Sequence, residues 1–470
     1  MIKVDAPQLK VYIYKTGARK RNVTKNRWGN FNTLNLTGFF TEGSSVTVNR
    51  SINNPNGGFT IKMADQFVPK YGDSIYGLIE PMDAIEISMS RVGEPVMVMR
   101  GVVNDIVLDE AIGQGPTRTV TISGGDYGAF LRMIQIMVVK GSDVDDLIYK
   151  TSGQYMQDKY GINYSIMTGD KFISAMTNMV VNPFVKGLLN PVLSDLKLDT
   201  DGADETDFVY PNGYQANPEG TMWTHFLTHG NLGPFYEMFF EDNEKDTTLV
   251  YRKPAFKLLA GDKYIFPNTK AKSFDIPPVE ITGIKYSRTD RNVANYFLVR
   301  SPKADMITGM DASAQSYMTD GTKLILDTYE NCAKDLFGRR QMLHTTNHGP
   351  MYGAVTLRPG LPKEEHETAV NYFTAYMIKQ IEFLKASNKD NAVFESGTLR
   401  CAGRPEYKVG HYCNIAWPSG VNASAYITSV AHTFEPFKGY TCTLQYERGT
   451  GFVNRTNAEN PYLRGQGVYQ

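Results

Sequence analysis

Short runs in which hydrophobic and polar residues alternate dominate the first part of the chain. Val46 and Val48 alternate with polar neighbours, and alternation resumes after a stretch rich in Asn and Gly at residues 53–58. Period-two patterns separated by turn residues predict β-strands joined by tight turns. The same alternation of hydrophobic and polar residues, with turn residues between the runs, continues through residues 72–122. We therefore predict a compact β-module over residues 1–137.

The period changes to a helical one in the next part of the chain, residues 138–275. Residues 142–160 and 171–196 carry apolar side chains at helical spacing. The second of these segments contains Pro183 and Pro191, and proline removes a helical hydrogen bond, so it should be a broken or kinked helix. A short helix and a β-hairpin are predicted to complete this module.

Strands are predicted again in the last part of the chain, interrupted by one long amphipathic helix at residues 363–388. The fold class is mainly β with α+β insertions, in which two similar β-barrel modules accompany a helix-and-hairpin module. The predicted boundaries after residue 275 are these: a second, split β-module at 276–305 and 390–450, an insertion at 306–389, and a polar tail at 451–470.

The first and last β-regions show a weak internal similarity, which a search for long-period repeats detects. Two readings stay open at this point, a duplicated module or a chance likeness between short strands with Gly turns. A doubled module would let three copies of the chain form a ring with six similar positions. In the best register, Val103, Ile106, Val120 and Ile122 correspond to Ile427, Val430, Cys442 and Leu444.

Composition excludes several classes of protein. The 470 residues carry 49 basic and 49 acidic side chains, so nothing marks the whole chain for neutralising nucleic-acid phosphates. Four widely spaced cysteines do not form the disulfide framework of a small secreted protein. The chain contains no apolar run of membrane-spanning length. We expect a protein made in the cytoplasm, with no membrane partner and no sequence-specific nucleic-acid partner.

Histidine pairs are the candidates for metal ligands. His225 and His229 are four residues apart in a predicted helix, and His344 and His348 repeat that spacing. Neither pair is accompanied by the Glu of an HExxH motif or by an evident third ligand. We therefore predict polar or partly buried histidines and no metal site, and we interpret His432 as a packing residue.

Motifs for catalysis and cofactor binding are also absent from the sequence. Residues 113–118 have a glycine-rich pattern but lack the Lys and Ser/Thr of a phosphate loop, so we predict a hairpin turn. Asp145 and Asp146 are adjacent charges at a helix start rather than a spaced acid and base. No GxSxG motif occurs. We predict no catalytic, cofactor-binding or metal-binding residues, and therefore no enzyme.

One cluster of basic residues stands out near the N-terminus. A solvated loop is the default interpretation, a docking contact to an acidic neighbouring subunit is the functional one, and nucleic-acid binding ranks third because few aromatic residues are interleaved. The cluster consists of Lys15, Arg19, Lys20, Arg21, Lys25 and Arg27.

Several local motifs occur in a fixed order along most of the chain. Trp223 with Phe226 and Leu227 precedes a hairpin that ends in Arg, a spacer and Pro. With these motifs the chain resembles the baseplate hub proteins of contractile-tailed phages, a family related to phage late-control proteins and to the N-terminal part of type VI secretion spike proteins. The other matching segments are residues 100–106, 119–127, 281–299, 403–417, 426–434 and 441–449. Residues 300–390 do not match the family pattern.

The resemblance implies a structural function. It implies a homotrimeric ring of pseudo-six-fold symmetry that joins a hexameric tail tube, or tube-initiator protein, to a separate trimeric spike in the virion baseplate. Neighbouring baseplate wedge proteins are further implied partners. Three alternatives stay open: the hub of a tailocin or another contractile injection system, a tail-associated cell-wall hydrolase, and a carbohydrate-binding tail module.

Overall fold

The computed structural model is that of a mainly β protein, as the sequence predicts. The predicted helix over residues 142–160 and the first half of the predicted helix over residues 363–388 lie outside the described residues. The structure describes residues 6–16, 33–52, 54–112, 116–136, 168–201, 220–260, 263–265, 271–300, 325–346, 378–416 and 422–453.

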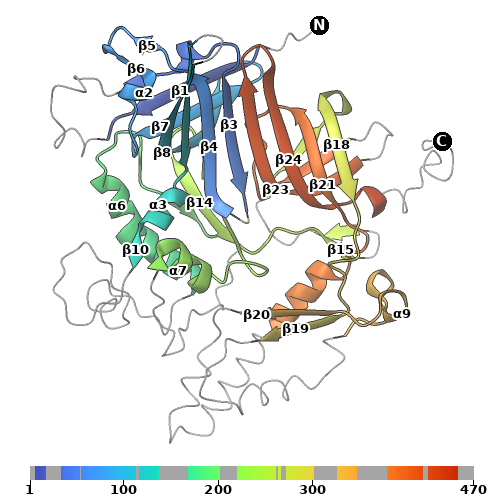
Figure 1. Cartoon of the computed structure of the whole chain (residues 1–470). Coiled ribbons are helices and arrows are strands. Elements are labelled where there is room, and N and C mark those ends of the chain that lie inside the picture. The colour runs from blue at the N-terminus through green and yellow to red at the C-terminus, as the bar shows by residue number, and fades with distance from the viewer. Residues whose placement is uncertain are drawn as a thin grey trace, which may run out of the picture.

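In the described part of the chain, thirteen strands form one large sheet, in which N-terminal and C-terminal strands lie side by side (Figure 1). The strands from the N-terminal part, which we call the first module, are β1 (Gln8–Tyr14), β2 (Thr33–Asn35), β3 (Ser45–Ser51), β4 (Asn54–Ala64), β7 (Ala84–Ser90), β8 (Val96–Ile112) and β9 (Pro116–Gly125). The strands of the second module are β17 (Ser273–Ile276), β18 (Ile281–Ser287), β21 (Glu395–Ala402), β22 (Tyr412–Ala416), β23 (Asn422–Glu435) and β24 (Gly439–Gly449).

The two modules share one strand topology. In the first module the neighbours run β7-β8-β9-β4-β3, and in the second they run β22-β23-β24-β21-β18. Corresponding strands follow one another in the same order along the chain, and every neighbouring pair in both series is antiparallel. The strand before each series differs, because β1 is antiparallel to β7 whereas β17 is parallel to β22. The weak similarity in sequence therefore reflects a repeated fold.

The register of the repeat agrees with the sequence alignment. Beyond a β-bulge in each module, Ile106 lies opposite Ile122, and Val430 lies opposite Leu444. The register shift between β8 and β9 falls at Asn104, and that between β23 and β24 falls at the corresponding residue, Thr428. A bulge sets the bend and twist of a strand. Its presence at the same position in both modules confirms the predicted register.

The modules are joined by direct strand pairing. Residues 429–434 of β23 pair antiparallel with residues 46–51 of β3. This pairing uses the edge of β23 that continues from its pairing with β22, because the opposite edge is occupied by β24. The result is one continuous sheet through both modules.

Alternation in the sequence explains where the core lies. Val46, Val48 and Ile61 are completely buried, while their polar neighbours along the strands are more exposed. These residues belong to the same core as Val430 and Leu444 of the second module. The inward faces of both modules thus pack into a single hydrophobic layer, as successive residues of a strand point to opposite faces.

A second core lies beneath the first module and contains helices (Figure 1). The helical segment begins with α5 (Gly169–Met176), passes through a π-helical turn, η3 (Thr177–Val181), and ends with α6 (Asn182–Gly187). Pro183 lies in the first turn of α6, where its missing N–H is tolerated. A π-turn just before a proline interrupts the regular helix, so the predicted broken helix is confirmed.

The predicted short helix and hairpin are also confirmed. Helix α7 (Met222–His229) begins after Thr221, whose hydroxyl accepts a hydrogen bond from the Thr224 backbone N–H at 3.2 Å. Strands β13 (Glu237–Asp242) and β14 (Thr247–Arg252) form the antiparallel hairpin, and β11 (Lys197–Asp199) adds a parallel strand to it. This hairpin contacts β4 and β8 of the first module.

The insertion between β18 and β21 forms a small sheet of its own, and its buried residues Phe297, Val299, Ile381 and Leu384 belong to the second core. Strands β19 (Tyr296–Arg300) and β20 (Gln341–Thr345) pair in parallel in a sheet of their own, so residues 296–300 do not join the large sheet. The described end of the predicted long helix, residues 378–388, is helical and buries Ile381 and Leu384. Two short helices, η6 (Glu330–Cys332) and α9 (Lys334–Phe337), complete the insertion.

None of the described helices is long and apolar enough to cross a membrane. The short elements that connect the parts of the structure are η1 (Thr37–Phe39), β5 (Phe67–Val68), β6 (Asp73–Ser74), α2 (Ile75–Leu78), α3 (Gly128–Met133), β10 (Gln135–Ile136), β12 (Gly220–Thr221), β15 (Leu258–Ala260), β16 (Lys263–Ile265) and η4 (Pro278–Glu280).

Candidate assembly surfaces and the charge network between modules

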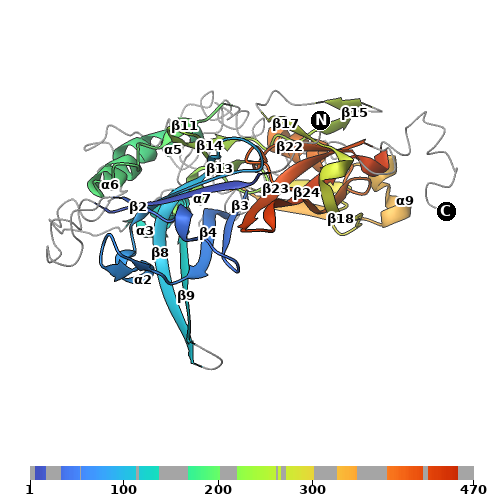
Figure 2. The ribbon, with the colours of Figure 1, turned by 90° about the horizontal axis from the view of Figure 1, so that it is seen from above.

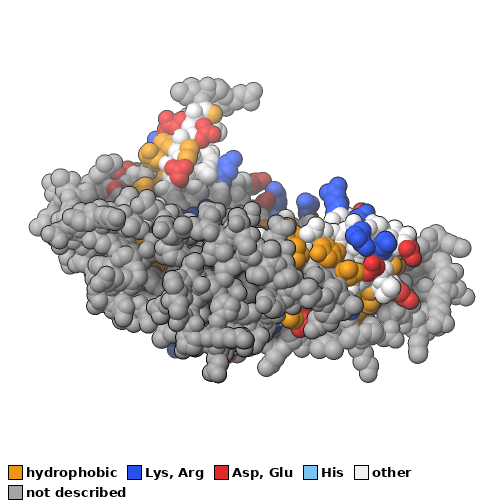
Figure 3. Space-filling view, turned by 90° about the horizontal axis from the view of Figure 1, so that it is seen from below, with side chains coloured by type: hydrophobic (Ala, Val, Ile, Leu, Met, Phe, Trp, Pro, Cys, Tyr) orange, Lys and Arg blue, Asp and Glu red, His pale blue; other side chains and the backbone are white. Residues whose placement is uncertain are grey.

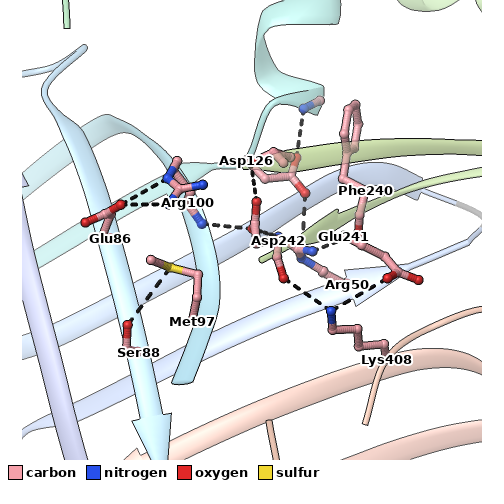
Figure 4. Close-up of polar contacts among 12 residues, drawn as sticks. Arg50, Glu86, Ser88, Met97, Arg100, Asp126, Phe240, Glu241, Asp242 and Lys408 are labelled. Carbon is pink, nitrogen blue, oxygen red and sulfur yellow. Dashed lines mark hydrogen bonds and ion pairs between the residues drawn. The ribbon is translucent and has the colours of Figure 1, made fainter. Parts of the chain in front are cut away.

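Buried ion pairs tie the hairpin β13–β14 to the first module (Figure 4). Arg50 of β3 forms an ion pair with Asp242 of β13 and donates to the Phe240 carbonyl oxygen at 2.7 Å. Asp242 also accepts hydrogen bonds from the Arg100 backbone N–H at 2.9 Å and from the Thr247 hydroxyl at 2.5 Å. Because its oxygens have several donors, this carboxylate is held in one orientation at the hairpin's end.

Asp126 adds a second carboxylate to the same arginine. Its Oδ2 lies 3.8 Å from Nε of Arg50, and its Oδ1 accepts a hydrogen bond from the Gly128 backbone N–H at 2.8 Å. Burial raises the pKa of Asp126 to about 7, although the charge of Arg50 opposes the shift. One arginine thus links strand β3, the end of β9 and the hairpin.

A matching set of buried contacts ties the hairpin to the second module. Glu237, at the start of β13, accepts a hydrogen bond from Nε of Arg252 at 2.8 Å. The hydroxyl of Tyr426, in β23, lies 2.7 Å from Oε1 of the same carboxylate. Arg252 also donates to the Gly410 carbonyl oxygen. All three side chains of this cluster are buried.

Glu241 makes a further contact to the second module. Its carboxylate lies 3.0 Å from Nε2 of His411 and 3.6 Å from Nζ of Lys408. Burial alone would raise the pKa of Glu241, but the hydrogen bond and charge of His411, with the charge of Lys408, lower it to about 2. Together these contacts hold both modules against one hairpin, so the angle between the modules is fixed by desolvated pairs.

Two of the sheet edges in the described part of the chain are candidate assembly surfaces. The hairpin of β8 and β9 projects from the body of the molecule (Figure 2). Its strand β8 pairs with β7 only as far as Val102, so residues 105–110 have β9 on one side and no described strand on the other. Strand β18 pairs with β21 on one side and forms the end of the large sheet. Both edges carry backbone groups that can pair with another strand.

The candidate metal ligands His225 and His229 lie together on α7 and are buried. Their rings stack with centroids 5.8 Å apart, and His229 packs 4.4 Å from the ring of Phe172. Within the described ranges, no group of three or more His, Cys, Asp or Glu side chains could hold a metal ion. His344 lies in β20, where burial lowers its pKa, and His348 lies outside the described residues.

His432 lies in the core of the second module, where the sequence interpretation put a packing residue. Its Nδ1 is 2.7 Å from the hydroxyl oxygen of Tyr440 and 3.1 Å from Sγ of Cys442. Burial lowers the pKa of His432 to about 3. The imidazole is therefore neutral at physiological pH and belongs to a buried polar cluster.

Lys15 is buried, whereas the basic cluster was predicted to form a solvated loop. Its Nζ lies 2.5 Å from Oδ2 of Asp83. An ammonium group enters a protein interior only with a partner of this kind. The other five members, Arg19, Lys20, Arg21, Lys25 and Arg27, lie outside the described residues.

Two further predictions concern residues 113–118 and the acidic pair Asp145 and Asp146. Strands β8 and β9 pair from Val102 and Gly125 to Ile112 and Pro116, as expected for a hairpin, although residues 113–115 themselves are not described. Asp145 and Asp146 also lie outside the described residues.

The charge network was not anticipated from the sequence. Arg50, Asp126 and Asp242 are far apart along the chain, and nothing in the sequence pairs them with one another. The one signal was indirect: a charged residue in a strand that otherwise alternates is a candidate for a buried pair.

Comparison with known proteins shows likeness in structure alone. No family model matches the chain, and no curated protein matches it. Among solved structures, the chain is similar to the tail protein from Neisseria meningitidis MC58, with 9% identity, coverage of 95% of this chain and 98% of that chain, and a TM-score of 0.48. A second match is the 43 kDa tail protein of prophage MuSo2 from Shewanella oneidensis, with 12% identity, coverage of 94% and 96%, and a TM-score of 0.45.

A third similar structure is an E. coli protein described as a component of the type VI secretion system, with 6% identity, coverage of 87% of this chain and 74% of that chain, and a TM-score of 0.34. The three matched proteins are thus two tail proteins, one of them from a prophage, and a component of the type VI secretion system.

Proposed function

We propose that the chain is a structural hub of a contractile phage tail. Three copies form a ring of pseudo-six-fold symmetry, which adapts a hexameric tail tube on one side to a trimeric spike, formed by a separate protein, on the other. Its function is mechanical and involves no catalytic step. The ordered motifs around Trp223 and along both modules support this setting.

The repeated strand topology is the observation that carries the proposal. Five strands occur twice in one chain with the same neighbours, the same directions and the same bulge position. A chain with two such modules presents two similar surfaces, so three chains present six. Heterologous contacts that complete a rotation close into rings. A ring of this kind can meet six identical subunits above it and three below it.

The charge network supports a role under mechanical load. The two modules of a chain must keep a fixed angle if a ring of three chains is to have pseudo-six-fold symmetry. Breaking a buried pair such as Arg50 and Asp242 leaves an uncompensated charge, which costs about 3–5 kcal/mol. Paired strands at β23 and β3 add backbone hydrogen bonds to the same junction.

The mass and shape of the purified protein test this proposal. Light scattering coupled to size-exclusion chromatography is expected to give three times the chain mass of 52.6 kDa. Electron micrographs viewed down the axis are expected to show a ring with six similar lobes around a channel. A monomer at micromolar concentration, or robust turnover of cell-wall glycan, would overturn it.

A further inference from the structure

The pairing that joins the two modules uses one edge from each. The second module contributes residues 429–434 of β23, and the first module contributes residues 46–51 of β3. At this junction Val430 and Val46 are almost completely buried. Because the modules are repeats, each of these edges has an equivalent elsewhere in the chain.

The registers identify the equivalent edges. Aligning the bulges at Asn104 and Thr428 matches residues 105–110 of β8 to residues 429–434 of β23. Ile61 lies opposite Ile122, and Leu399 lies opposite Leu444. Because Ile122 and Leu444 correspond in the alignment, Ile61 and Leu399 occupy matching positions. Their partners on the next strands are Val46 and Ile284. Residues 284–289, in β18 and just after it, therefore match residues 46–51 of β3.

Both equivalent edges are exposed in the single chain. Ile106 and Ile284 are only half-buried, whereas their counterparts Val430 and Val46 have 1% and 0% of their surface exposed. Val107 of β8 is 50% exposed. The inward-facing apolar side chains of β8 and β18 thus lack the cover that strand pairing gives at the internal junction.

The two edges carry opposite charges. Residues 105–110 contain three acidic and no basic side chains, and residues 284–289 contain two basic and no acidic ones. Figure 3 shows acidic side chains gathered on the projecting hairpin, and Lys and Arg side chains gathered on the other half of the same face. Opposite charges on two edges of one molecule favour head-to-tail association of copies.

We infer that β8 of one copy pairs antiparallel with β18 of the next copy, in the register of the internal junction between β23 and β3. This inference rests on the proposed ring and names the contact that closes it. Transferring the register puts Asp109 directly opposite Lys285, at the positions that Thr433 and Thr47 occupy within the chain. It also puts Leu108 opposite Tyr286, on the face that continues the hydrophobic core.

The pairing completes the sheet around the ring. The path from β18 to the projecting part of β8 already contains eight strands in each chain. Joining β8 to β18 of the next copy extends that path from chain to chain. The pairing covers these two edges, which would otherwise be open to aggregation.

A disulfide trap tests the predicted register. Directly opposite residues of an antiparallel pair have Cα atoms about 4.5–5.5 Å apart, a separation that suits a disulfide. The variant with Asp109→Cys and Lys285→Cys is therefore expected to form a covalent trimer on mild oxidation. The four native cysteines are buried, which keeps the background low.

A matched control shifts one cysteine along the same strand. Asp105→Cys with Lys285→Cys moves the thiol by four residues, roughly 13 Å along the strand, and is expected to give no cross-link. Circular dichroism shows whether each variant is folded. Charge reversal provides a second test that needs no cysteine: Asp109→Lys alone should weaken the trimer about fivefold per contact, and adding Lys285→Asp should restore it.

The outcomes separate this inference from the proposed function. If the protein is a trimer but the Asp109 and Lys285 cysteines do not cross-link and charge reversal has no effect, the named interface is wrong while the ring proposal stands. If the unmodified protein is a monomer at all concentrations, both fail. Cross-linking in the shifted control at equal yield would also overturn the predicted register.

Discussion

Phe59 lies directly opposite Gly124 in the pair formed by β4 and β9. The matching positions of the second module are Gly397 and Tyr446, which also lie opposite each other. Each module thus fills this place in the sheet with one aromatic ring and one glycine, but the two residue types have exchanged strands. The repeat preserves the volume at this place rather than the residue at each position.

Gly124→Ala is expected to destabilise the first module strongly. A Cβ at this position would lie 2.0 Å from the Val102 carbonyl oxygen and 2.5 Å from the ring of Phe59. The backbone oxygen cannot move away without disturbing the pairing of β8, so the apparent free energy of unfolding should fall by about 1–3 kcal/mol or more. Urea unfolding followed by circular dichroism measures this change.

Gly58→Ala is the control for this substitution. Its Cβ would have only one neighbour, the Gly124 carbonyl oxygen at the ordinary distance of 3.6 Å. An equal loss of stability in both variants would show that the close contact at Gly124 is not the cause.

Arg50→Ala is expected to destabilise the joint between the modules and the hairpin. The substitution leaves Asp242 and Asp126 without their shared cation in a buried site, at a cost of about 3–5 kcal/mol. Hydrogen exchange of the β13 and β3 amides should rise before that of the other strands. Lys10→Ala, which removes an exposed pair with Glu94, is the comparison and should leave exchange at these strands unchanged.

Tyr426→Phe is expected to weaken the contact between the hairpin and the second module. The lost hydroxyl lies 2.5 Å from Oε2 of the buried Glu237 carboxylate, while Oε1 keeps its hydrogen bond from Arg252. Leaving a buried acceptor without this donor costs about 1–3 kcal/mol. Thermal unfolding of this variant should begin at a lower temperature than that of the wild type. Tyr76→Phe, at a side chain that is 42% exposed, should leave the transition unchanged.

The repeat could be predicted from the sequence because it is written in local patterns. Apolar residues such as Val103, Val120 and Ile122 mark the buried face of β8 and β9, and the same pattern recurs in the second module. The break before Pro183 was likewise predictable from the chemistry of proline. Such features depend on neighbours along the chain.

The junction of the modules could not be predicted in this way. The pairing of residues 429–434 with residues 46–51 is made by backbone groups, which leave no signature in the side chains. Lys15 was predicted to lie in a solvated loop, and Arg50 drew no prediction, because a single sequence does not reveal which carboxylate will be folded against a basic side chain. Contacts between distant segments therefore required the structure.

Acidification is expected to destabilise the second module through His432. Burial lowers its folded-state pKa to about 3, below the ordinary value of 6.5. The unfolded chain therefore binds more protons between these values, so the contribution of the neutral imidazole is fully present above pH 6.5 and is lost as pH falls toward 3. At pH 4.5 the loss relative to pH 7 should be about 3 kcal/mol, since each unit of pKa shift corresponds to about 1.4 kcal/mol.

His432→Gln isolates this effect from the other titrating groups. The amide does not titrate, so the variant should be less stable than the wild type at pH 7 but should lose less stability between pH 7 and pH 4.5. Asp126 acts in the opposite direction, because its raised pKa makes its contribution to stability decrease as pH rises toward 7. Glu241, with its pKa lowered to about 2, acts in the same direction as His432. Both are present in the two proteins and cancel in the comparison. Equal pH dependence of urea unfolding in the wild type and in His432→Gln would show that this histidine is not the responsible group.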